Sequence, residues 1–367
     1  MPWQEWLVWA VSIIPILLTL LPLWRTPKWW VRIWDYPRLQ ISFVLAGVAL
    51  IELLSLEVAT DSVVLLIVTL GCLAWQVSRI WRYTLISPKQ VLQAEQADLP
   101  NSICVLIANV LQSNRKYEGL LAQIEAKDPD IVLTVETDRW WMERLLPLKE
   151  RYPFTVLHPL DNTYGMLLFS RLELSAIKLQ DRVTPEIPSI FARVRMRSGK
   201  TIDLFCVHPE PPQIDNDVEE RDAELLLVAK EVARSKRPAI VCGDLNDVAW
   251  SHTTKLFQRI SGLLDPRVGR GIYPTFHAGH WFARWPLDHV FHHPSFRLRN
   301  LQVLDNFGSD HFPVLVSLHQ DPTAVWEQEA PLPEPEDRVE AEQKIIEGRA
   351  AAAEAEIPAH SRGETGA

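Results

Sequence analysis

The strongest constraint on the fold of this chain is a series of three long apolar runs within its first hundred residues. The runs cover about residues 4–24, 39–59 and 62–81. Each is long enough for a helix that crosses a bilayer, which needs about 20 mostly apolar residues. Only Thr60 and Asp61 separate the second run from the third, which predicts a tight helical hairpin. We therefore expect a transmembrane region with three helices over residues 1–85 and a linker over residues 86–100.

Lys and Arg flank these runs unevenly. The loop after the first run and the segment after the third hold Arg25, Lys28, Arg32, Arg38, Arg79, Arg82 and Lys89. The loop between the second and third runs holds none, so the positive-inside rule places the N-terminus outside and the rest of the chain in the cytoplasm. Glu52 and Glu57 fall inside the second run, where an acid can reach the interface, pair within the bundle or have a function. We expect a structural role for both.

Downstream of about residue 100 the pattern changes to short apolar strands and amphipathic helices. Several consecutive strands between residues 166 and 208 alternate apolar and polar residues, as antiparallel strands do. This mixture favours an α+β fold, with two packed sheets flanked by helices, over a doubly wound parallel sheet. We expect one such domain over residues 101–319.

The last segment, residues 320–367, is rich in Pro and Glu and holds 12 acidic and 4 basic residues. It therefore carries most of the net charge of −9, and its composition predicts a disordered acidic tail with a transient helix over 337–356. The domain before it is close to neutral, which argues against a non-specific nucleic-acid binder. The four cysteines form no C-x-x-C pair, so a zinc ribbon is not supported.

Polar side chains that can bind a metal ion or a phosphate stand at six strand ends. They are Asn109, Glu136, His208, Asp244 with Asn246, Asp288 with His289, and Ser309 with Asp310 and His311. One such residue is more often part of a turn than of a site. Six are a different matter, because strand ends in layered α/β folds gather at one edge and build the site there.

The residue types fit a divalent cation and a phosphoester. Mg²⁺ prefers hard oxygen ligands, so Glu136, the Asn109 amide and an Asp would suffice. Asp244 could orient or deprotonate a water molecule, and His311, held by a carboxylate such as Asp288, could stabilise developing charge or protonate a leaving oxygen. A second amide, on Asn246, could donate to a phosphoryl oxygen.

These residues belong to segments that occur in a recognisable order. The segments are Asn109, Glu136, 164-YGMLLFSR-171, 208-HPEPP-212, 243-GDLN-246, 287-LDHVF-291 and 309-SDHFPV-314. Together they resemble the endonuclease/exonuclease/phosphatase superfamily over about residues 101–319. The G-D-x-N and S-D-H-x-P motifs are specific in combination, and Phe312 stands where the family often has a basic residue.

The resemblance implies a four-layer α/β/β/α sandwich of the deoxyribonuclease I type and phosphoester hydrolysis dependent on Mg²⁺, with Mn²⁺ as the alternative ion. It assigns metal binding to Asn109, Glu136 and Asp310, and catalysis to His208, Asp244, Asn246, Asp288 and His311. Tyr164 matches the Tyr-Gly strand of the family and is expected to contact substrate.

Aromatic residues precede Asp288 in a segment that should overhang the site. Trp281 and Trp285, with Phe282 between them, could stack on a base or enter lipid, which makes both tryptophans candidate substrate-binding residues, and core packing is the equal alternative. The nearby His277, His280, His292 and His293 are expected at the surface or the substrate rim rather than in a second metal cluster.

We therefore expect a bacterial-type, membrane-anchored phosphoesterase in an inner membrane, with its catalytic domain on the cytoplasmic side. The membrane region makes a lipid-linked phosphate ester a plausible substrate, and membrane lipids the neighbours of the helices. A nuclease acting on DNA or RNA is the first alternative, and an inactive membrane scaffold or sensor is the second. The sequence identifies no protein partner.

Overall fold

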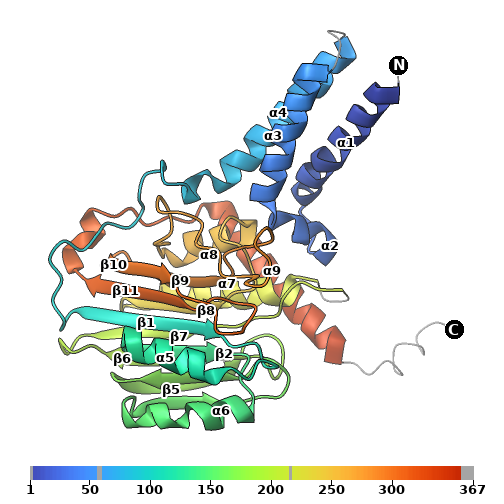
Figure 1. The fold of residues 1–367 in the computed structure, drawn as a ribbon. Coiled ribbons are helices and arrows are strands. Elements are labelled where there is room, and N and C mark those ends of the chain that lie inside the picture. Colours follow the sequence, from blue (N-terminus) through green and yellow to red (C-terminus); the bar gives the residue numbers. More distant parts are fainter. Residues whose placement is uncertain (1–2, 56–59, 215–216, 357–367) are drawn as a thin grey trace.

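The computed structural model describes residues 3–55, 60–214 and 217–356 and shows a helical projection on a layered domain (Figure 1). The N-terminal helices are α1 (Trp3–Leu20), η1 (Leu21–Leu23), α2 (Trp29–Arg32), η2 (Ile33–Asp35), α3 (Arg38–Ser55), α4 (Thr60–Ile80) and η3 (Trp81–Tyr83). Helices α1, α3 and α4 lie side by side and project away from the domain. The end of the second apolar run, residues 56–59 with Glu57, lies outside the described residues.

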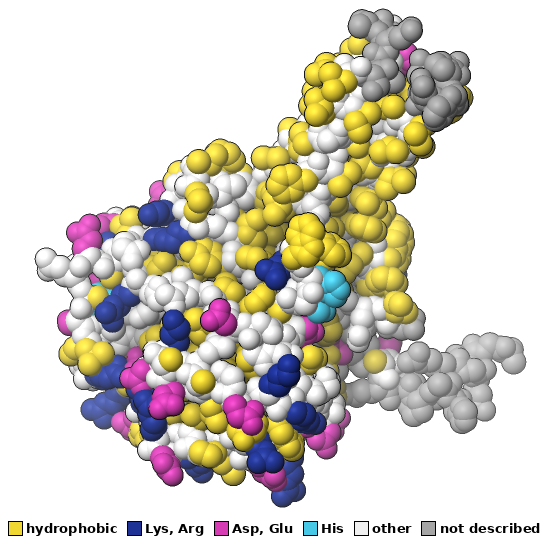
Figure 2. All heavy atoms as spheres, in the orientation of Figure 1, with side chains coloured by type: hydrophobic (Ala, Val, Ile, Leu, Met, Phe, Trp, Pro, Cys, Tyr) yellow, Lys and Arg dark blue, Asp and Glu magenta, His cyan; other side chains and the backbone are white. Residues whose placement is uncertain are grey.

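The projecting helices α1, α3 and α4 have the surface that a bilayer requires. Two helical segments, Trp6–Leu23 and Thr60–Tyr83, are long and apolar enough to cross a membrane. The bent pair Trp29–Asp35 and Arg38–Leu54, with 73° between its parts, makes a third if it counts as one span. Figure 2 shows hydrophobic side chains over this projection and most of the charged ones on the domain. Two or three spans are therefore supported, while the side of the membrane stays a prediction.

Polar side chains inside the projecting helices pair with one another. Thr69 Oγ1 donates to Glu52 Oε1 at 2.9 Å, and both residues are buried. Arg38 Nη1 donates to Gln76 Oε1 at 2.8 Å, and Gln76 Nε2 donates to Thr19 Oγ1 at 3.1 Å. Such bonds between helices stabilise a membrane bundle because the polar groups have few other partners in lipid. The structural role expected for Glu52 agrees with this pairing.

Two mixed sheets form the domain. The first has the order β10 (Phe296–Val303), β11 (Val314–Gln320), β1 (Ser102–Asn109), β2 (Ile131–Val135), β4 (Met166–Ser170) and β3 (Phe154–His158). The second has the order β5 (Glu173–Asp181), β6 (Pro188–Arg195), β7 (Thr201–Cys206), β8 (Ala239–Asp244) and β9 (Asp288–His292). Strands β1 and β2 are parallel, as are β7 and β8, and the other neighbours are antiparallel. The predicted α+β class is confirmed.

The alternation along the strands explains the layers. In β1, Ile103, Val105 and Ile107 enter the core between the two sheets, whereas Leu106 and Ala108 face the helices on the other side, because successive side chains of a strand point to opposite faces. Helices α5 (Tyr117–Lys127) and α6 (Arg139–Leu145), followed by η4 (Leu146–Glu150), cover the first sheet. Helices α7 (Glu219–Arg234) and α8 (His252–Ser261) cover the second.

The C-terminal segment is ordered where the composition predicts a disordered tail, and a helix is present where one was predicted, over 337–356. It forms η5 (Pro322–Trp326) and a long helix, α9 (Pro335–Glu356), which packs on α7 and α8. Ala341 and Ile345 of α9 join the core of the second helical layer, and Arg259 donates two 2.7 Å hydrogen bonds to Asp337. The acidic side chains of α9 are therefore stabilised by ion pairs with basic side chains of the domain. Residues 357–367 lie outside the described residues.

The N-terminal region and the domain share a hydrophobic cluster. Tyr36, Ile80 and Tyr83 pack there with Trp250 and Val248 of the domain. The predicted linker, 86–100, also lies on the domain, because Leu298 N donates to Leu92 O and Ala94 N donates to Leu298 O, both at 2.9 Å. The helical region is thus built onto the domain rather than tethered to it.

Candidate active site

The ends of four strands bring the predicted site residues together. Asn109 ends β1 and pairs with Val135 at the end of the parallel strand β2, so Glu136 follows at the same edge. In the second sheet, Asp244 ends β8 and pairs with Asp288, the first residue of the antiparallel strand β9. The S-D-H segment is fixed to the first sheet because Ser309 Oγ donates to Asn109 O at 2.8 Å.

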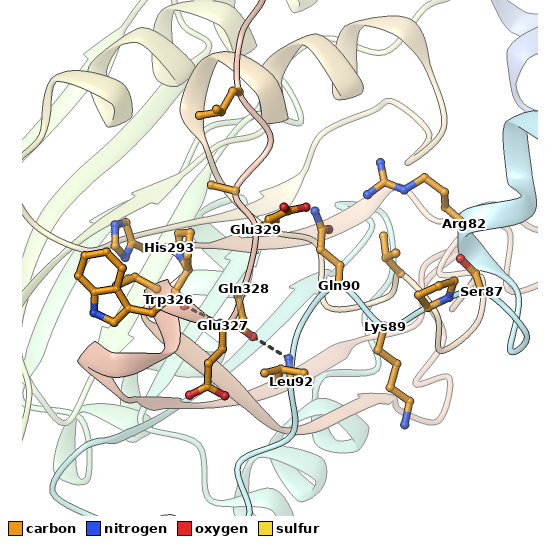
Figure 3. A pocket seen from close by; sticks show the side chains of 16 residues that line it. Arg82, Ser87, Lys89, Gln90, Leu92, His293, Trp326, Glu327, Gln328 and Glu329 are labelled. Carbon is orange, nitrogen blue, oxygen red and sulfur yellow. Dashed lines mark hydrogen bonds between the residues drawn. The ribbon is translucent and has the colours of Figure 1, made fainter.

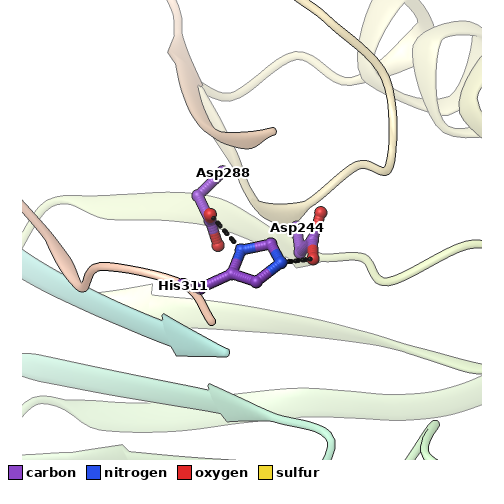
Figure 4. Close-up of side chains that lie close together, drawn as sticks. All are labelled: Asp244, Asp288 and His311. Atoms are coloured by element: carbon purple, nitrogen blue, oxygen red, sulfur yellow. Dashed lines mark hydrogen bonds and ion pairs between the residues drawn. The ribbon is translucent and has the colours of Figure 1, made fainter. Parts of the chain in front are cut away.

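The centre of the site is a histidine between two carboxylates (Figure 4). His311 Nδ1 lies 2.8 Å from Asp288 Oδ2, and His311 Nε2 lies 3.5 Å from Asp244 Oδ2. All three side chains are buried. Burial alone would lower the pKa of His311, but Asp288 and Asp244 outweigh it and raise this pKa to about 10. The imidazole is therefore positively charged at neutral pH, with both nitrogens facing acids.

The same three residues can hold a divalent metal ion. One ligand atom from each of Asp244, Asp288 and His311 lies within 4.8 Å of the others. Ligation through His311 requires the neutral imidazole, so the charged bridge and a His-bound metal are alternative states of this group. Among the described residues, Asp288 Oδ1 and His208 Nδ1 are buried without a hydrogen-bond partner. Such atoms need an explanation, and a ligand or an ion supplies one.

Asn109 and Glu136 extend this group toward the first sheet. Asn109 Nδ2 donates to Glu136 Oε1 at 2.7 Å and to Asp244 Oδ2 at 3.0 Å. Its oxygen accepts from Leu111 N at 3.0 Å, so the amide nitrogen faces the two acids. Metal binding by Asn109 and Glu136 stays a prediction, and for Asn109 it requires the amide to turn. The carboxylates of Glu136, from the first sheet, and Asp244, from the second, nevertheless lie close together around this amide. A cation site needs carboxylates that converge in this way.

His208 is a second histidine beside Asp244. Its Nε2 is 4.0 Å from Asp244 Oδ2, and burial lowers the pKa of His208 although Asp244 and Glu136 oppose this effect. The ring of Tyr164 lies 5.4 Å from the ring of His208. The sequence predicted both residues for the site, and the structure brings them together. Their contact with substrate stays a prediction.

The charge of Asp244 follows from its neighbours. Burial acts to raise the pKa of Asp244, but His311, His208 and the hydrogen bond from Asn109 outweigh it, so the pKa lies below its usual value. The backbone N–H of Asn246 also donates to Asp244 Oδ1, at 2.9 Å. An ionised carboxylate can bind a cation or accept a proton from water, which are the two roles that phosphoester hydrolysis needs.

Residues 244–247, which we name the Asp244 turn, explain the G-D-L-N sequence. Gly243 has φ 143°, and a Cβ atom there would lie 1.9 Å from Val207 O, so only glycine fits. Asn246 has φ 49°, in the left-handed region that Asn tolerates better than most residues. Asn246 Nδ2 donates to Pro209 O at 2.9 Å. The Asn246 amide was predicted to donate to a phosphoryl oxygen. One of its two N–H groups already makes this structural hydrogen bond, so only the other could donate to substrate.

Asp310, the third predicted metal ligand, sits beside this group. It is half-buried, and Ser309 Oγ lies 3.4 Å from its Oδ1. Ser309 Oγ also accepts from His311 N at 3.0 Å. One serine thus orders the backbone of the whole S-D-H segment, while metal binding by Asp310 stays a prediction.

A loop over residues 276–285, which we name the aromatic loop, runs beside the site. Trp281 is 83% exposed and Phe282 is 58% exposed. Trp285 is different, because it packs on Phe276 and Tyr36 with 6.0 Å between ring centroids in each case. Trp285 is therefore partly buried by packing, and its contact with substrate stays a prediction, while Trp281 and Phe282 are exposed to a substrate or a lipid surface.

Sequence analysis missed two residues at the site. The ring of Phe276 lies 4.9 Å from the ring of His311, and Thr275 Oγ1 accepts from the backbone N–H groups of Leu287 and Asp288 at 3.1 Å. Thr275 thereby fixes the start of β9. Neither residue belongs to a motif, so the sequence alone carried no signal for them.

The expectation that four histidines line the surface or the rim holds for only part of the set. His292 is fully buried in β9, where burial lowers its pKa to about 4, so the expected rim position is wrong. The alternation of β9 explains this, because His292 faces the core between the sheets beside Phe296. His277 and His280 lie in the aromatic loop with 4.4 Å between their rings.

A large pocket lies elsewhere (Figure 3). It has a volume of about 940 Å³ and lies between the segment after α4, with Arg82 and Lys89, and the η5 region, with Trp326 and Glu327. Gln328 closes one side by accepting from Leu92 N at 2.6 Å. The residues that line it include none of the Asp244, Asp288 and His311 group, so the chemistry of the side chains, not pocket volume, locates the candidate site.

Comparisons with known proteins agree with this geometry. A model of the Endonuclease/Exonuclease/phosphatase family matches residues 106–311. A search of curated proteins finds no match. Among solved structures, humanized D. rerio TDP2 with 14 mutations has a TM-score of 0.51 and 14% identity, over 60% of this chain and 100% of that chain. D. rerio TDP2 complexed with a single strand DNA product has a TM-score of 0.50 and 15% identity, over 60% of this chain and 99% of that chain. An endonuclease/exonuclease/phosphatase from Beutenbergia cavernae has a TM-score of 0.49 and 20% identity, over 60% of this chain and 72% of that chain.

The likeness to the two TDP2 structures shows a shared fold, two mixed sheets flanked by helices of the deoxyribonuclease I type. The N-terminal helices and α9 lie outside the matched residues 106–311. The matched segment includes Asn109, Glu136, Asp244, Asp288 and His311. Since the match covers more than half of the chain, the protein belongs to the endonuclease/exonuclease/phosphatase family and is a hydrolase of phosphoester bonds.

Proposed function

We propose that this protein is a membrane-anchored, divalent-metal-dependent phosphoesterase that acts on a phosphate ester carried by a lipid. The observation that carries the proposal is the buried chain Asp288–His311–Asp244, to which Asn109 links Glu136 by hydrogen bonds. A buried imidazolium between two acids is costly to build, so its presence at a strand-end edge points to chemistry rather than to stability.

The residues divide the work of hydrolysis. Asp244 is ionised because its pKa is held low, so it can orient the attacking water or accept its proton. His311 presents a positive charge to the phosphoryl oxygens as negative charge develops, and Asp288 keeps it charged and oriented. His208, neutral and with its Nδ1 unpartnered among the described residues, contacts the phosphate.

A divalent metal ion would be held by the carboxylates of Glu136 and Asp310 and by the Asn109 amide, once that amide turns its oxygen toward the ion. These residues would thereby supply Lewis-acid polarisation of the phosphoryl oxygen and a lower pKa for a bound water molecule. The all-oxygen donor set suits Mg²⁺ or Mn²⁺. We prefer it to the Asp244, Asp288 and His311 set because His311 already pairs with acids at both nitrogens.

The aromatic loop supports a lipid-borne substrate. Its exposed residues, Trp281 and Phe282, stand next to the projecting helices, because Gln40 Nε2 near the start of α3 donates to Phe282 O at 2.8 Å. Exposed aromatic side chains beside membrane spans favour the interface of a bilayer. The fold likeness to TDP2 with a single strand DNA product keeps a nuclease as the second candidate.

The test of hydrolysis uses the full chain in proteoliposomes, with bis(p-nitrophenyl) phosphate as the soluble probe and Mg²⁺ present. We expect Asp244→Ala to reduce turnover at least about 100-fold, as removal of a group that activates water does, and EDTA to abolish it. Asp305→Ala, the same change at an exposed acid, is the control and should keep wild-type activity. Turnover that survives both EDTA and Asp244→Ala, or a wild-type chain inactive on every phosphoester offered, would contradict the proposal.

The test of substrate class compares three substrates. These are phospholipid in vesicles of phosphatidylethanolamine and phosphatidylglycerol, a single-stranded DNA oligonucleotide, and the soluble probe. We expect the double change Trp281→Ala and Phe282→Ala to lower lipid hydrolysis about tenfold and to leave the soluble probe unaffected. Trp326→Ala, at an exposed tryptophan in the pocket of Figure 3, is the matched control. Faster hydrolysis of the oligonucleotide than of any lipid would favour the nuclease instead.

A further inference from the structure

A residue of the N-terminal region touches the Asp244 turn directly. The hydroxyl of Tyr36, in the short segment between η2 and α3, donates to Asn246 O at 2.6 Å. Tyr36 is buried, with 6% of its surface exposed, and it lies outside the matched family segment, residues 106–311. The membrane-side helices therefore supply a contact to the turn that carries Asp244.

The backbone carbonyl of Asn246, to which Tyr36 donates, helps to hold the Asp244 turn in its conformation. Asn246 O also accepts from Arg221 Nη1 at 2.9 Å, so both of its lone pairs are used. On the other side of the same residue, Asn246 N donates to Asp244 Oδ1 at 2.9 Å. With φ 49°, Asn246 has a backbone conformation that the surroundings must hold in place. Without the Tyr36 hydroxyl, Arg221 is the remaining donor to this carbonyl among the described residues, so we expect Asn246 to hold the Asp244 carboxylate less firmly.

The surroundings of Tyr36 fix it in position. Trp250 Nε1 donates to Asp35 O at 2.7 Å, which ties the end of η2 to the domain. The ring of Tyr36 packs edge-on against Trp285 of the aromatic loop. Arg221, the second donor, is held by Asp222, and Asp222 in turn accepts from Lys344 Nζ of α9 at 2.8 Å. The two elements added to the family domain thus converge on one carbonyl group.

We infer that Tyr36 is a positioning residue for phosphoester hydrolysis, so that the N-terminal helices complete the active site in addition to anchoring it. The inference rests on the proposed function and adds a residue that no family motif contains. The Tyr36 hydroxyl fixes the backbone of Asn246 by a hydrogen bond, and the backbone N–H of Asn246 orients the Asp244 carboxylate. Activity therefore depends on how the N-terminal helices pack on the domain.

The test is Tyr36→Phe in the full chain, reconstituted in the same proteoliposomes. The matched control is Tyr83→Phe, because Tyr83 is equally buried in the same cluster and its hydroxyl donates to Ala249 O at 2.7 Å, just beyond the turn. Each change removes one hydroxyl and one bond to a backbone carbonyl, so the two variants should lose similar amounts of thermal stability. We expect kcat to fall about tenfold or more in Tyr36→Phe with KM within about twofold, and kcat to stay near wild type in Tyr83→Phe.

Hydrogen exchange supplies a readout that needs no substrate. We expect the amides of residues 244–248 to exchange at least about threefold faster in Tyr36→Phe than in the wild type, and to be unchanged in Tyr83→Phe. Equal kcat and equal exchange in the two variants would overturn the inference, even with an active wild type. An inactive wild type would instead contradict the proposed function, and the exchange rates alone would then decide whether Tyr36 holds the turn.

Discussion

Glu224 of α7 is a buried acid outside the active site whose charge depends on pH in the physiological range. It is 3% exposed, and burial raises the pKa of its carboxyl to about 8, with Arg182 opposing the shift and Glu210 and Asp181 adding to it. In the folded chain it is therefore protonated at neutral pH, whereas in the unfolded chain it ionises near pH 4. Each pKa unit of such a difference corresponds to about 1.4 kcal/mol.

The sign of the effect follows from proton binding. Between the two pKa values the folded chain holds a proton that the unfolded chain releases, so the contribution of Glu224 to stability is complete below about pH 4 and is lost as the pH rises toward 8. We expect Glu224→Gln to remove this loss, so that the melting temperature of the variant exceeds that of the wild type at pH 8 and the two converge at pH 5. Glu125→Gln, at an exposed acid of α5, should follow the wild type. Parallel curves for Glu224→Gln and the wild type would contradict the assignment.

The residues that the sequence predicted and those it missed differ in how they are specified. Asp244, Asp288 and His311 stand in short motifs at strand ends, and the sheet brings them together as expected. Tyr36 reaches Asn246 across 210 positions in the chain, and no local pattern encodes that contact. For Trp285 the sequence left substrate contact and core packing as equal alternatives, and the packing partner Tyr36 was not visible from the sequence.

At the scale of elements, the periodicity of apolar residues predicted the long, regular strands and helices. It missed short elements, and acidic composition hid the order of the last helix. Strands such as β1 and β8 read clearly because both of their faces are buried. Strand β3 (Phe154–His158) was not predicted, since it is a half-buried edge strand of five residues without alternating burial. The short helices α2 and η2, which set the position of Tyr36, fall in a loop that has no amphipathic pattern long enough to detect.

Helix α9 shows how composition can mislead. Its acidic residues predict disorder, yet a stripe of Ala341, Ile345 and Ala352 is buried, and the acids have basic partners on α7 and α8. At Gly348 the two backbones come close, because a Cβ atom there would lie 2.4 Å from Glu219 O of α7. The small residue in the middle of an acidic helix therefore has a packing reason, and only the tertiary structure reveals it.

At the scale of the whole molecule, packing continues across residues 101 and 319, where the sequence predicts domain boundaries. The cluster of Tyr36, Ile80 and Tyr83 with Trp250 and Val248 crosses the first boundary. The packing of α9 on α7 crosses the second. Packing therefore continues from the N-terminal helices through the domain to the last helix, and Tyr36 contacts the turn that carries Asp244.

This continuity makes a prediction about fragments. A chain of residues 101–319 loses both contacts and exposes Trp250, which is 1% exposed in the full chain. Burial of apolar surface is worth about 25 cal/mol per Å², so two lost contact areas of this kind remove several kcal/mol. At roughly 2–4 °C per kcal/mol for a domain of this size, we expect the fragment to melt at least about 10 °C below the full chain in the same detergent. A fragment of residues 101–356 should recover part of the difference, because it keeps α9 but not Tyr36 and Tyr83. Equal melting temperatures for the shorter fragment and the full chain would show instead that the domain is independent of its anchor, and the coupling through Tyr36 would then have no structural basis.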